Sequence, residues 1–378
     1  MVPTKPEQVT DEWLTKVLQD ATKKDIEVLK VEGHKNEGGV LSCVFKAVAQ
    51  IDGQKTKLFI KTMPLPDQPQ RVFIEDFGLD DREVETFTRI LGQLETFEKE
   101  TLGQSGIKSI TCRFFAGNCC QEKSNRGFYV VMEDISSDYT MPDLDKGMSK
   151  GQIESALKKL AYLHALSYCY GQKSGKDFTK EYPMAYHSFL EGKDSQKFIE
   201  EMFKRAGEGL CKSNETQLAE ILENMSKKYI AKFKIGYGGQ DGRFITHGDM
   251  WSNNVMCHNS KDDCILIDWQ FTCASSPYLD IAAMIYMSQD PDLVEKHSCE
   301  MLKTYLNRFE EICLAFQIKS PWDNFDSFQT LAYKEGYLSL FVWMLVSFSP
   351  CVYTTRILDR FIYVFKKAIQ LNPEFFNE

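Results

Sequence analysis

The sequence is poor in histidine, with six among 378 residues, and none of its twelve cysteines form a pair with C-x-x-C spacing. Only Cys119 and Cys120 are adjacent, while Cys257, Cys264 and Cys273 are too widely spaced to predict a tetrahedral zinc site. The cysteines are therefore expected to be structural, mostly buried free thiols of a protein in a reducing compartment. The scarcity of imidazole also gives little support to a transition-metal site.

Positive charge is in deficit as well. The 45 lysines and arginines are outnumbered by 54 aspartates and glutamates, which leaves a formal net charge of −9. This balance argues against sequence-independent binding of nucleic acid, which needs a basic face, and it provides no electrostatic attraction to anionic membranes. Any phosphate group that the protein binds must therefore be held by local groups, against the net charge.

Long apolar runs are missing too. The N-terminal residues lack the continuous apolar core of a signal peptide. The most apolar stretch, 336–352, is interrupted by three serines and Pro350, and it is shorter than the roughly 20 residues that a membrane span requires. We predict a buried helix there and no membrane span, and we expect the protein to be cytoplasmic.

The chain is longer than one compact core usually allows, so two lobes are expected. The first third has strand character. Residues 41–51 and 55–62 flank Asp52 and Gly53, a strong signal for a two-residue hairpin turn. Residues 81–98 are predicted to form a helix and residues 126–133 a further strand.

The pattern changes after residue 135. Residues 152–170 form an apolar-periodic helix, and most of the chain beyond them is helical apart from a strand-rich segment at 243–270. We predict an α+β fold with two lobes. Residues 1–135 form a small lobe with an antiparallel sheet and one main helix, and residues 136–378 form a larger, mostly helical lobe.

The segment with the most chemical information is 247–256, with the sequence HGDMWSNNVM. It is followed by a short strand, a polar turn at 258–263 and a second strand that ends in Asp268. If the turn closes a hairpin, Asp268 lies opposite Asn253 or Asn254, and Asp249 lies on the loop that leads into it. Phosphoryl transfer needs such a set, with oxygen ligands for Mg²⁺ and a carboxylate that accepts the proton of an attacking hydroxyl.

The spacing H-x-D-x-x-x-x-N, followed by a strand-terminal aspartate, is that of the catalytic and metal loops of the kinase fold. The fuller pattern His-Gly-Asp-x-Trp-x-Asn-Asn-x-Met resembles the ecdysteroid-kinase-like (CHK kinase-like) family, which is grouped with the aminoglycoside phosphotransferases and choline kinases. The resemblance extends loosely over nearly the whole chain. It implies a two-lobed protein-kinase-like fold that uses ATP and Mg²⁺.

The resemblance also implies roles for single residues. Asp249 is the expected catalytic base, and Asn254 and Asp268 are the expected metal ligands. His247 and Asp280 are expected to support the catalytic loop. Asn253 remains an alternative to its neighbour, and His164, which matches a histidine of the central helix of this fold, is interpreted as a packed structural residue.

In the first lobe, Lys61 ends a strand and is placed to reach the phosphates of ATP, with a helical glutamate holding it. Glu83 fits that glutamate best, and Glu85 is the competing choice. Gly38 and Gly39 lie where a loop over the nucleotide is expected, although no G-x-G-x-x-G is present.

Ser42 comes after these glycines and is expected to belong to the same nucleotide site. The strand that ends in Glu133 leads into the expected hinge, where backbone groups near Glu133 and Ile135 would bond to adenine.

The sequence therefore predicts a small-molecule O-kinase that transfers the γ-phosphoryl group of ATP to a hydroxyl of a lipophilic acceptor such as an ecdysteroid. A protein kinase is disfavoured because no Asp-Phe-Gly follows the H-x-D-x-x-x-x-N segment, where Asp268-Trp269-Gln270 stands instead, and no Ala-Pro-Glu is present. One alternative is a pseudokinase-type module that binds nucleotide or steroid without turnover. Another is a metal-dependent hydrolase built on His247, Asp249 and Asp268. The sequence specifies neither the acceptor nor the oligomeric state.

Overall fold

The computed structural model describes residues 2–24, 26–33, 42–64, 71, 74–75, 77–122, 125–182, 193–226, 241–347 and 355–377. The chain divides into two compact units, the first formed by Met1–Thr140 with Ile265–Thr272 and the second by Met141–Cys264 with Cys273–Glu378. The sequence predicts a boundary near residue 135 and keeps 136–378 together. The observed units instead assign a short segment around Asp268 to the first unit.

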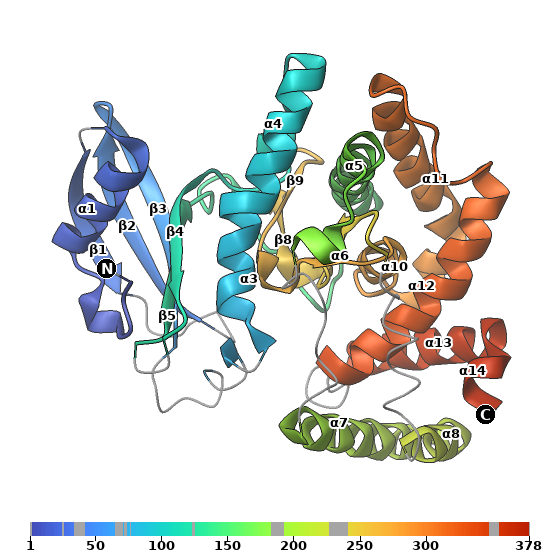
Figure 1. Ribbon diagram of the computed structural model, residues 1–378. Coiled ribbons are helices and arrows are strands. Elements are labelled where there is room, and N and C mark those ends of the chain that lie inside the picture. The colour runs from blue at the N-terminus through green and yellow to red at the C-terminus, as the bar shows by residue number, and fades with distance from the viewer. Residues whose placement is uncertain are drawn as a thin grey trace. The chain divides into compact units, whose positions relative to one another are not determined.

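The first unit is built on a five-stranded antiparallel sheet, drawn in blue and green in Figure 1. Its strand order is β1-β2-β3-β5-β4, with β1 (Ile26–Gly33), β2 (Cys43–Ile51), β3 (Gln54–Thr62), β4 (Phe114–Cys120) and β5 (Gly127–Glu133). The predicted hairpin is confirmed, since Ile51 pairs with Gln54. Asp52 and Gly53 both adopt positive φ angles, 51° and 76°, which is the backbone that a tight hairpin turn of this kind requires.

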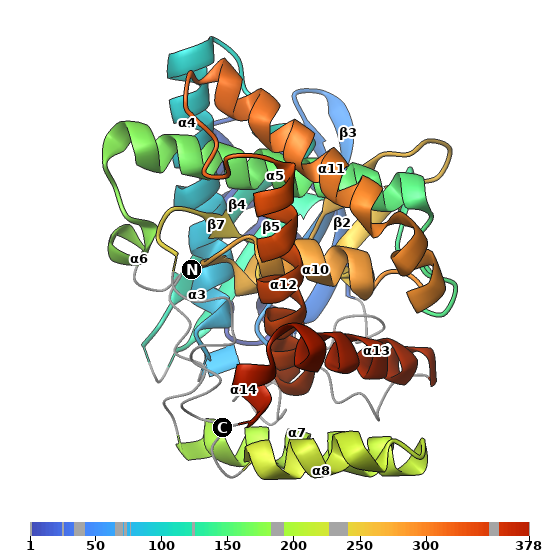
Figure 2. The same ribbon diagram turned by 90° about the vertical axis from the view of Figure 1, so that its right-hand side faces the viewer.

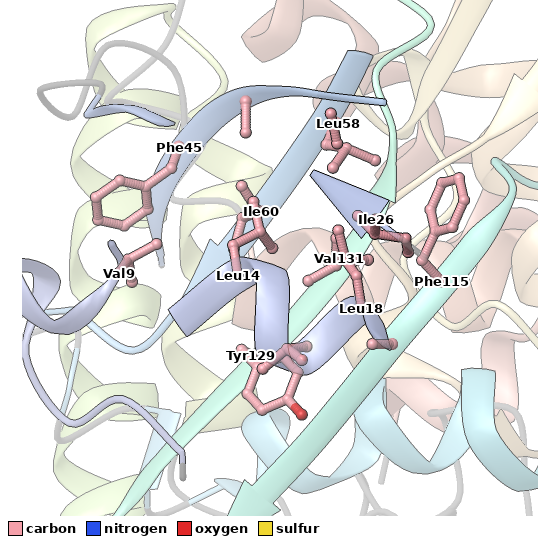
Figure 3. Close-up of a cluster of buried hydrophobic side chains, with 14 of the residues drawn as sticks. Val9, Leu14, Leu18, Ile26, Phe45, Leu58, Ile60, Phe115, Tyr129 and Val131 are labelled. Carbon is pink, nitrogen blue, oxygen red and sulfur yellow. The ribbon is translucent and has the colours of Figure 1, made fainter. Parts of the chain in front are cut away.

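The two faces of this sheet are covered by different helices. Helix α1 (Asp11–Thr22) packs on one face, and its Leu14 and Leu18 join a core with alternate residues of the strands, including Phe45 and Ile60 (Figure 3). Because side chains alternate along a strand, Lys61 points to the opposite face.

That opposite face meets helix α3 (Leu79–Glu85), which continues through a short π-helical segment (Thr86–Ile90) into α4 (Leu91–Leu102). The helix predicted at 81–98 is therefore present but interrupted. A short strand, β6 (Tyr139–Thr140), ends this part of the unit.

The second unit is mostly helical. Its central helix is α5 (Lys150–Ser174), which begins at a Ser149–Gln152 capping box and packs against α11 (Pro291–Ala315). Helix α10 (Tyr278–Tyr286) packs against α5 and α12 (Phe325–Ser347), as Figure 2 shows. The remaining helices are α6 (Phe178–Glu181), α7 (Lys193–Lys212), α8 (Thr216–Ser226), α13 (Thr355–Leu371) and α14 (Pro373–Asn377).

Short strands separate these helices where the functional motif lies. They are β7 (Ile245–Thr246), β8 (Val255–His258), β9 (Cys264–Leu266) and β10 (Cys273–Ala274), and β7 pairs with β10. Residues 336–347 of the apolar stretch near the C-terminus form the second half of α12, where residues 340–345 are buried as predicted; the rest of the stretch lies outside the described residues. Among the helices that the structure describes, none is long and apolar enough to cross a membrane. The mixed α+β architecture predicted from the sequence, with an N-terminal antiparallel sheet and a mostly helical second unit, is confirmed.

Candidate active site

Lys61 forms the centre of a buried ionic group in the first unit. Its Nζ donates to Glu83 Oε1 and Oε2 at 3.0 and 2.8 Å and to Asp268 Oδ1 at 2.6 Å. Lys61 is 8% exposed, and Glu83 is fully buried. All three ammonium protons thus point to carboxylate oxygens, and the group carries one net negative charge.

The charges of this group depend on each other. Burial opposes the charge of Lys61, but the carboxylates of Asp268 and Glu83 outweigh it and raise the lysine pKa above its ordinary value. Burial raises the pKa of Glu83, and the Lys61 ammonium opposes that rise. Lys61 is therefore a permanent cation at neutral pH, suited to bind phosphate oxygens.

Glu83, and not Glu85, is the partner of the lysine. Glu85 lies two residues further along the helix and pairs instead with Arg89, one turn away. The position of α3 is secured by Asp80, a fully buried residue one turn before Glu83. Arg126 donates to both oxygens of Asp80 at 2.9 Å, which joins the helix to the β4–β5 hairpin.

Asp268 has an unusual backbone. Its φ is 64° and its ψ is 66°, in the left-handed region, immediately before the 3₁₀ turn Trp269–Phe271. Aspartate tolerates this region better than most residues do, but single strained positions of this kind are concentrated at functional sites. The adjacent Trp269 is fully buried, and its indole N–H donates to Thr111 at 3.0 Å, which fixes the turn.

Asp249 and Asn254 lie together in the second unit. The side-chain amide of Asn254 donates to Asp249 Oδ2 at 2.7 Å and to the Asp249 carbonyl at 2.6 Å. This use of both N–H bonds leaves Oδ1 of Asn254 as the atom that can accept or bind a cation. The Asp249 carboxylate is half-buried and is oriented by Asn254.

Asp280 holds the loop that carries Asp249. Its Oδ2 accepts the backbone N–H of His247 at 2.6 Å, and its Oδ1 accepts that of Gly248 at 2.9 Å. Gly248 has a φ of 80°, a conformation that favours glycine, which explains why a glycine stands between His247 and Asp249. His164 on α5 donates to the same carboxylate, with its Nε2 at 3.2 Å from Oδ2.

The polar turn predicted at 258–263 closes a hairpin, as expected from the sequence. The backbone N–H of His258 donates to the Asp263 carbonyl at 2.8 Å, and Cys257 lies across from Cys264 with their sulfurs 3.1 Å apart. Asn254 belongs to the second unit and Asp268 to the first. Their joint binding of one metal ion therefore remains a prediction.

The structure describes only some of the other residues that are predicted to contact the nucleotide. Gly38 and Gly39 lie outside the described residues. Ser42 is buried, and its hydroxyl has no hydrogen-bond partner within the described part of the chain. At the predicted adenine contacts, the N–H of Glu133 donates to the Arg113 carbonyl and the carbonyl of Ile135 accepts from the N–H of Asp138, so part of that backbone is already hydrogen-bonded.

The donor set suits Mg²⁺ better than a transition metal. Within the described ranges, no cluster of three or more histidine, cysteine, aspartate or glutamate side chains could hold a metal ion. Mg²⁺ normally keeps several waters and takes one or two protein oxygens together with substrate phosphates. The two predicted ligands, the amide oxygen of Asn254 and the carboxylate of Asp268, are oxygen donors of that chemical kind.

Known proteins share features of this chain. Residues 39–317 match the family model described as the ecdysteroid kinase-like family. A search of curated proteins found no significant match. Similar solved structures include the choline kinase LicA from Streptococcus pneumoniae, with 12% identity, coverage of 95% of this chain and 98% of that chain, and a TM-score of 0.39.

Two other solved structures are also similar. An ethanolamine kinase from Plasmodium vivax has 15% identity, coverage of 92% of this chain and 83% of that chain, and a TM-score of 0.41. An aminoglycoside 2′-phosphotransferase-IIIa has 10% identity, coverage of 96% and 98%, and a TM-score of 0.42.

Proposed function

This chain belongs to the ecdysteroid kinase-like family, and from that membership we propose that it is an ATP- and Mg²⁺-dependent phosphotransferase whose acceptor is a hydroxyl group of a small molecule. The observation that carries the proposal is the buried group in which Lys61 bonds to both Glu83 and Asp268. A lysine held in this way, next to a carboxylate at a strained turn, is the arrangement that phosphoryl transfer uses to bind and orient phosphates.

In the proposed reaction, the acceptor oxygen bonds to the γ-phosphorus while the bond from that phosphorus to the bridging oxygen of ADP breaks. Asp249 accepts the proton of the attacking hydroxyl, and Asn254 keeps the carboxylate oriented through its bond to Oδ2. Lys61 neutralises phosphate charge, and Ser42 supplies a buried hydroxyl near the start of β2. When bound, Mg²⁺ offsets the charge that develops on the phosphate oxygens, and Asn254 and Asp268 would hold it.

The acceptor is proposed to be lipophilic, with an ecdysteroid as the leading example suggested by the family. We propose residues 1–135 as the nucleotide-binding part, with adenine bonded near Glu133 and Ile135, and 136–378 as the part with the acceptor site. We also propose a cytoplasmic location, a reducing compartment in which cysteines such as Cys169 and Cys313 stay thiols.

A module that binds nucleotide without turnover is the second candidate. It is favoured by one contact, because Asp268 Oδ1 is already bonded to Lys61 and a metal ion has to compete for that carboxylate. Tight binding of nucleotide that is insensitive to Mg²⁺, with no ADP release in the presence of any acceptor, would favour this candidate.

The test is a screen of steroid alcohols including an ecdysteroid, glucosides, choline and simple alcohols with Mg·ATP. We expect ADP release to match a mass gain of one phosphoryl group on one class of acceptor. Asp249→Asn should lose this activity, whereas Asp323→Asn, an exposed aspartate paired with Lys319, should keep it. Equal rates in the native protein and Asp249→Asn would exclude Asp249 as the base.

A further inference from the structure

We propose that Tyr305, on helix α11, is a positioning residue of the catalytic loop that acts through His164 and Asp280. The inference rests on the proposed function, because it concerns the loop that carries Asp249. Tyr305 is 141 residues from His164 in the sequence, and its hydroxyl lies 2.9 Å from His164 Nδ1. His164 in turn contacts Asp280 across 116 residues.

Asp280, the last acceptor in the series Tyr305–His164–Asp280, determines the direction of both hydrogen bonds. Asp280 takes N–H groups from His247, Gly248 and His164, and a carboxylate can only accept. With a single proton on its ring, His164 therefore carries that proton on Nε2, and its Nδ1 has a lone pair. Nδ1 needs a donor, and the Tyr305 hydroxyl provides it.

Burial makes this donor important. Tyr305, His164 and Asp280 are all fully buried, so water cannot replace a lost bond. Burial also raises the pKa of Tyr305 well above its ordinary value, so the hydroxyl keeps its proton. The ring is held in place, since it stacks on Phe328 with centroids 5.6 Å apart and planes 5° apart.

Without the Tyr305 hydroxyl, the Asp280 carboxylate still requires the proton of His164 on Nε2, but the buried Nδ1 lone pair loses its donor. The imidazole is then held at one end only, and it can turn away from the orientation in which Nε2 bonds to Asp280. Asp280 would then lose one of its three donors, and its hold on the backbone of His247 and Gly248 would loosen. The expected consequence is a less well oriented Asp249, which lowers the rate of phosphoryl transfer more than it changes nucleotide binding.

The test compares Tyr305→Phe with Tyr278→Phe. Tyr278 is a buried tyrosine on α10 that accepts a hydrogen bond from Trp322 Nε1 at 2.7 Å, so both variants remove one buried hydrogen bond. We expect similar losses of thermal stability, but only Tyr305→Phe should lower kcat, on the order of tenfold, with KM for ATP changed by less than about twofold.

Nitrogen-15 NMR of labelled histidine gives a reading that is independent of turnover. We expect native His164 to carry its proton on Nε2, and the Nδ1 signal to move in Tyr305→Phe and stay in place in Tyr278→Phe. A native proton on Nδ1, an unmoved Nδ1 signal in Tyr305→Phe, or equal kcat values for the two variants would overturn the inference. If the native protein transfers phosphate to no acceptor, the phosphotransferase proposal fails, and the NMR result still decides the role of Tyr305.

Discussion

Substitutions of Lys61 and Glu83, singly and together, test how the buried ionic group of the first unit is stabilised. Lys61→Met leaves Glu83, which is fully buried, beside Asp268, whose side chain is 30% exposed, with no cation between them. Removal of one partner of a buried ion pair costs about 3–5 kcal/mol, and we expect a loss in this range. Glu83→Gln keeps the side-chain size and leaves Lys61 paired with Asp268 at 2.6 Å, so about 1–2 kcal/mol is expected.

The double variant is the informative one. Lys61→Met with Glu83→Gln removes the cation and also the buried carboxylate that the cation compensated. In the native protein, Glu83→Gln should lower the free energy of unfolding by about 1–2 kcal/mol. In the Lys61→Met background, the same substitution should instead raise it by about 1–2 kcal/mol, because the two effects are coupled. The exposed pair Lys319 and Asp323 is the control, because its side chains are 82% and 81% exposed and its removal should cost under about 1 kcal/mol.

The pH dependence of Lys61→Met has a definite sign. Burial already raises the pKa of Glu83, and removal of the Lys61 ammonium takes away the charge that opposes this rise. A carboxyl whose pKa is higher in the folded than in the unfolded protein makes the folded state bind more protons, so stability increases as pH falls. The pKa of Lys61 itself is raised by Asp268 and Glu83 despite burial, so in the native protein its contribution stays constant below the lysine range.

The stability deficit of Lys61→Met should therefore narrow as pH is lowered from about 7.5 toward about 5. The assay is urea unfolding followed by tryptophan fluorescence at several pH values, with circular dichroism to check that each variant folds. Additive losses in the double variant, or a deficit that widens at low pH, would refute the account of this group.

Two further substitutions address parts of the same unit. Arg126→Ala should remove both hydrogen bonds to Asp80 and raise KM for ATP on the order of tenfold, and Arg126→Lys should restore much of the native KM. Steady-state kinetics measure these values, and an unchanged KM in Arg126→Ala would contradict this role of the Arg126–Asp80 pair. Asp268→Asn should leave the Lys61–Glu83 pair in place but lower turnover on the order of a hundredfold. The variant should also need a higher Mg²⁺ concentration for half-maximal activity, and half-saturation at the native concentration would show that Asp268 is not a ligand.

Local patterns predict much of the fold. The Asp52-Gly53 turn is specified by its own backbone preferences, and it places Lys61 at the end of the correct strand. The apolar stretch in α12 is distinguished from a membrane span by its length and its serines alone. Each of these features depends on a few neighbouring residues, and it can therefore be predicted from a single sequence.

Contacts between distant segments cannot be predicted in this way. From the sequence, Glu83 and Glu85 both look like members of a charged helix face. Only the rotation of α3 about its axis, which the structure shows, turns Glu83 toward Lys61 and Glu85 toward Arg89. Asp80 and Arg126 are 46 residues apart, and nothing in the sequence near either residue indicates their pairing.

The buried residues that contact Asp280 show the same limit. The sequence predicts that His164 is packed, and it is, but its ring also bonds to Asp280 and Tyr305. A buried polar residue in an apolar-periodic helix is the one signal that could have drawn attention to it. Cys257 and Cys264 are far apart by the standard of a zinc motif, although the hairpin turn predicted between them brings their sulfurs to 3.1 Å.

The most direct test of the central claim measures nucleotide binding and phosphoryl transfer on the same samples of native protein and Asp249→Asn. If Asp249 accepts the proton of the acceptor hydroxyl, the variant should bind Mg·ATP within about threefold of the native affinity while transfer falls by about 10²–10⁴-fold. Transfer at the native rate, with phosphate appearing on the same acceptor, would contradict the assignment of Asp249 as the base.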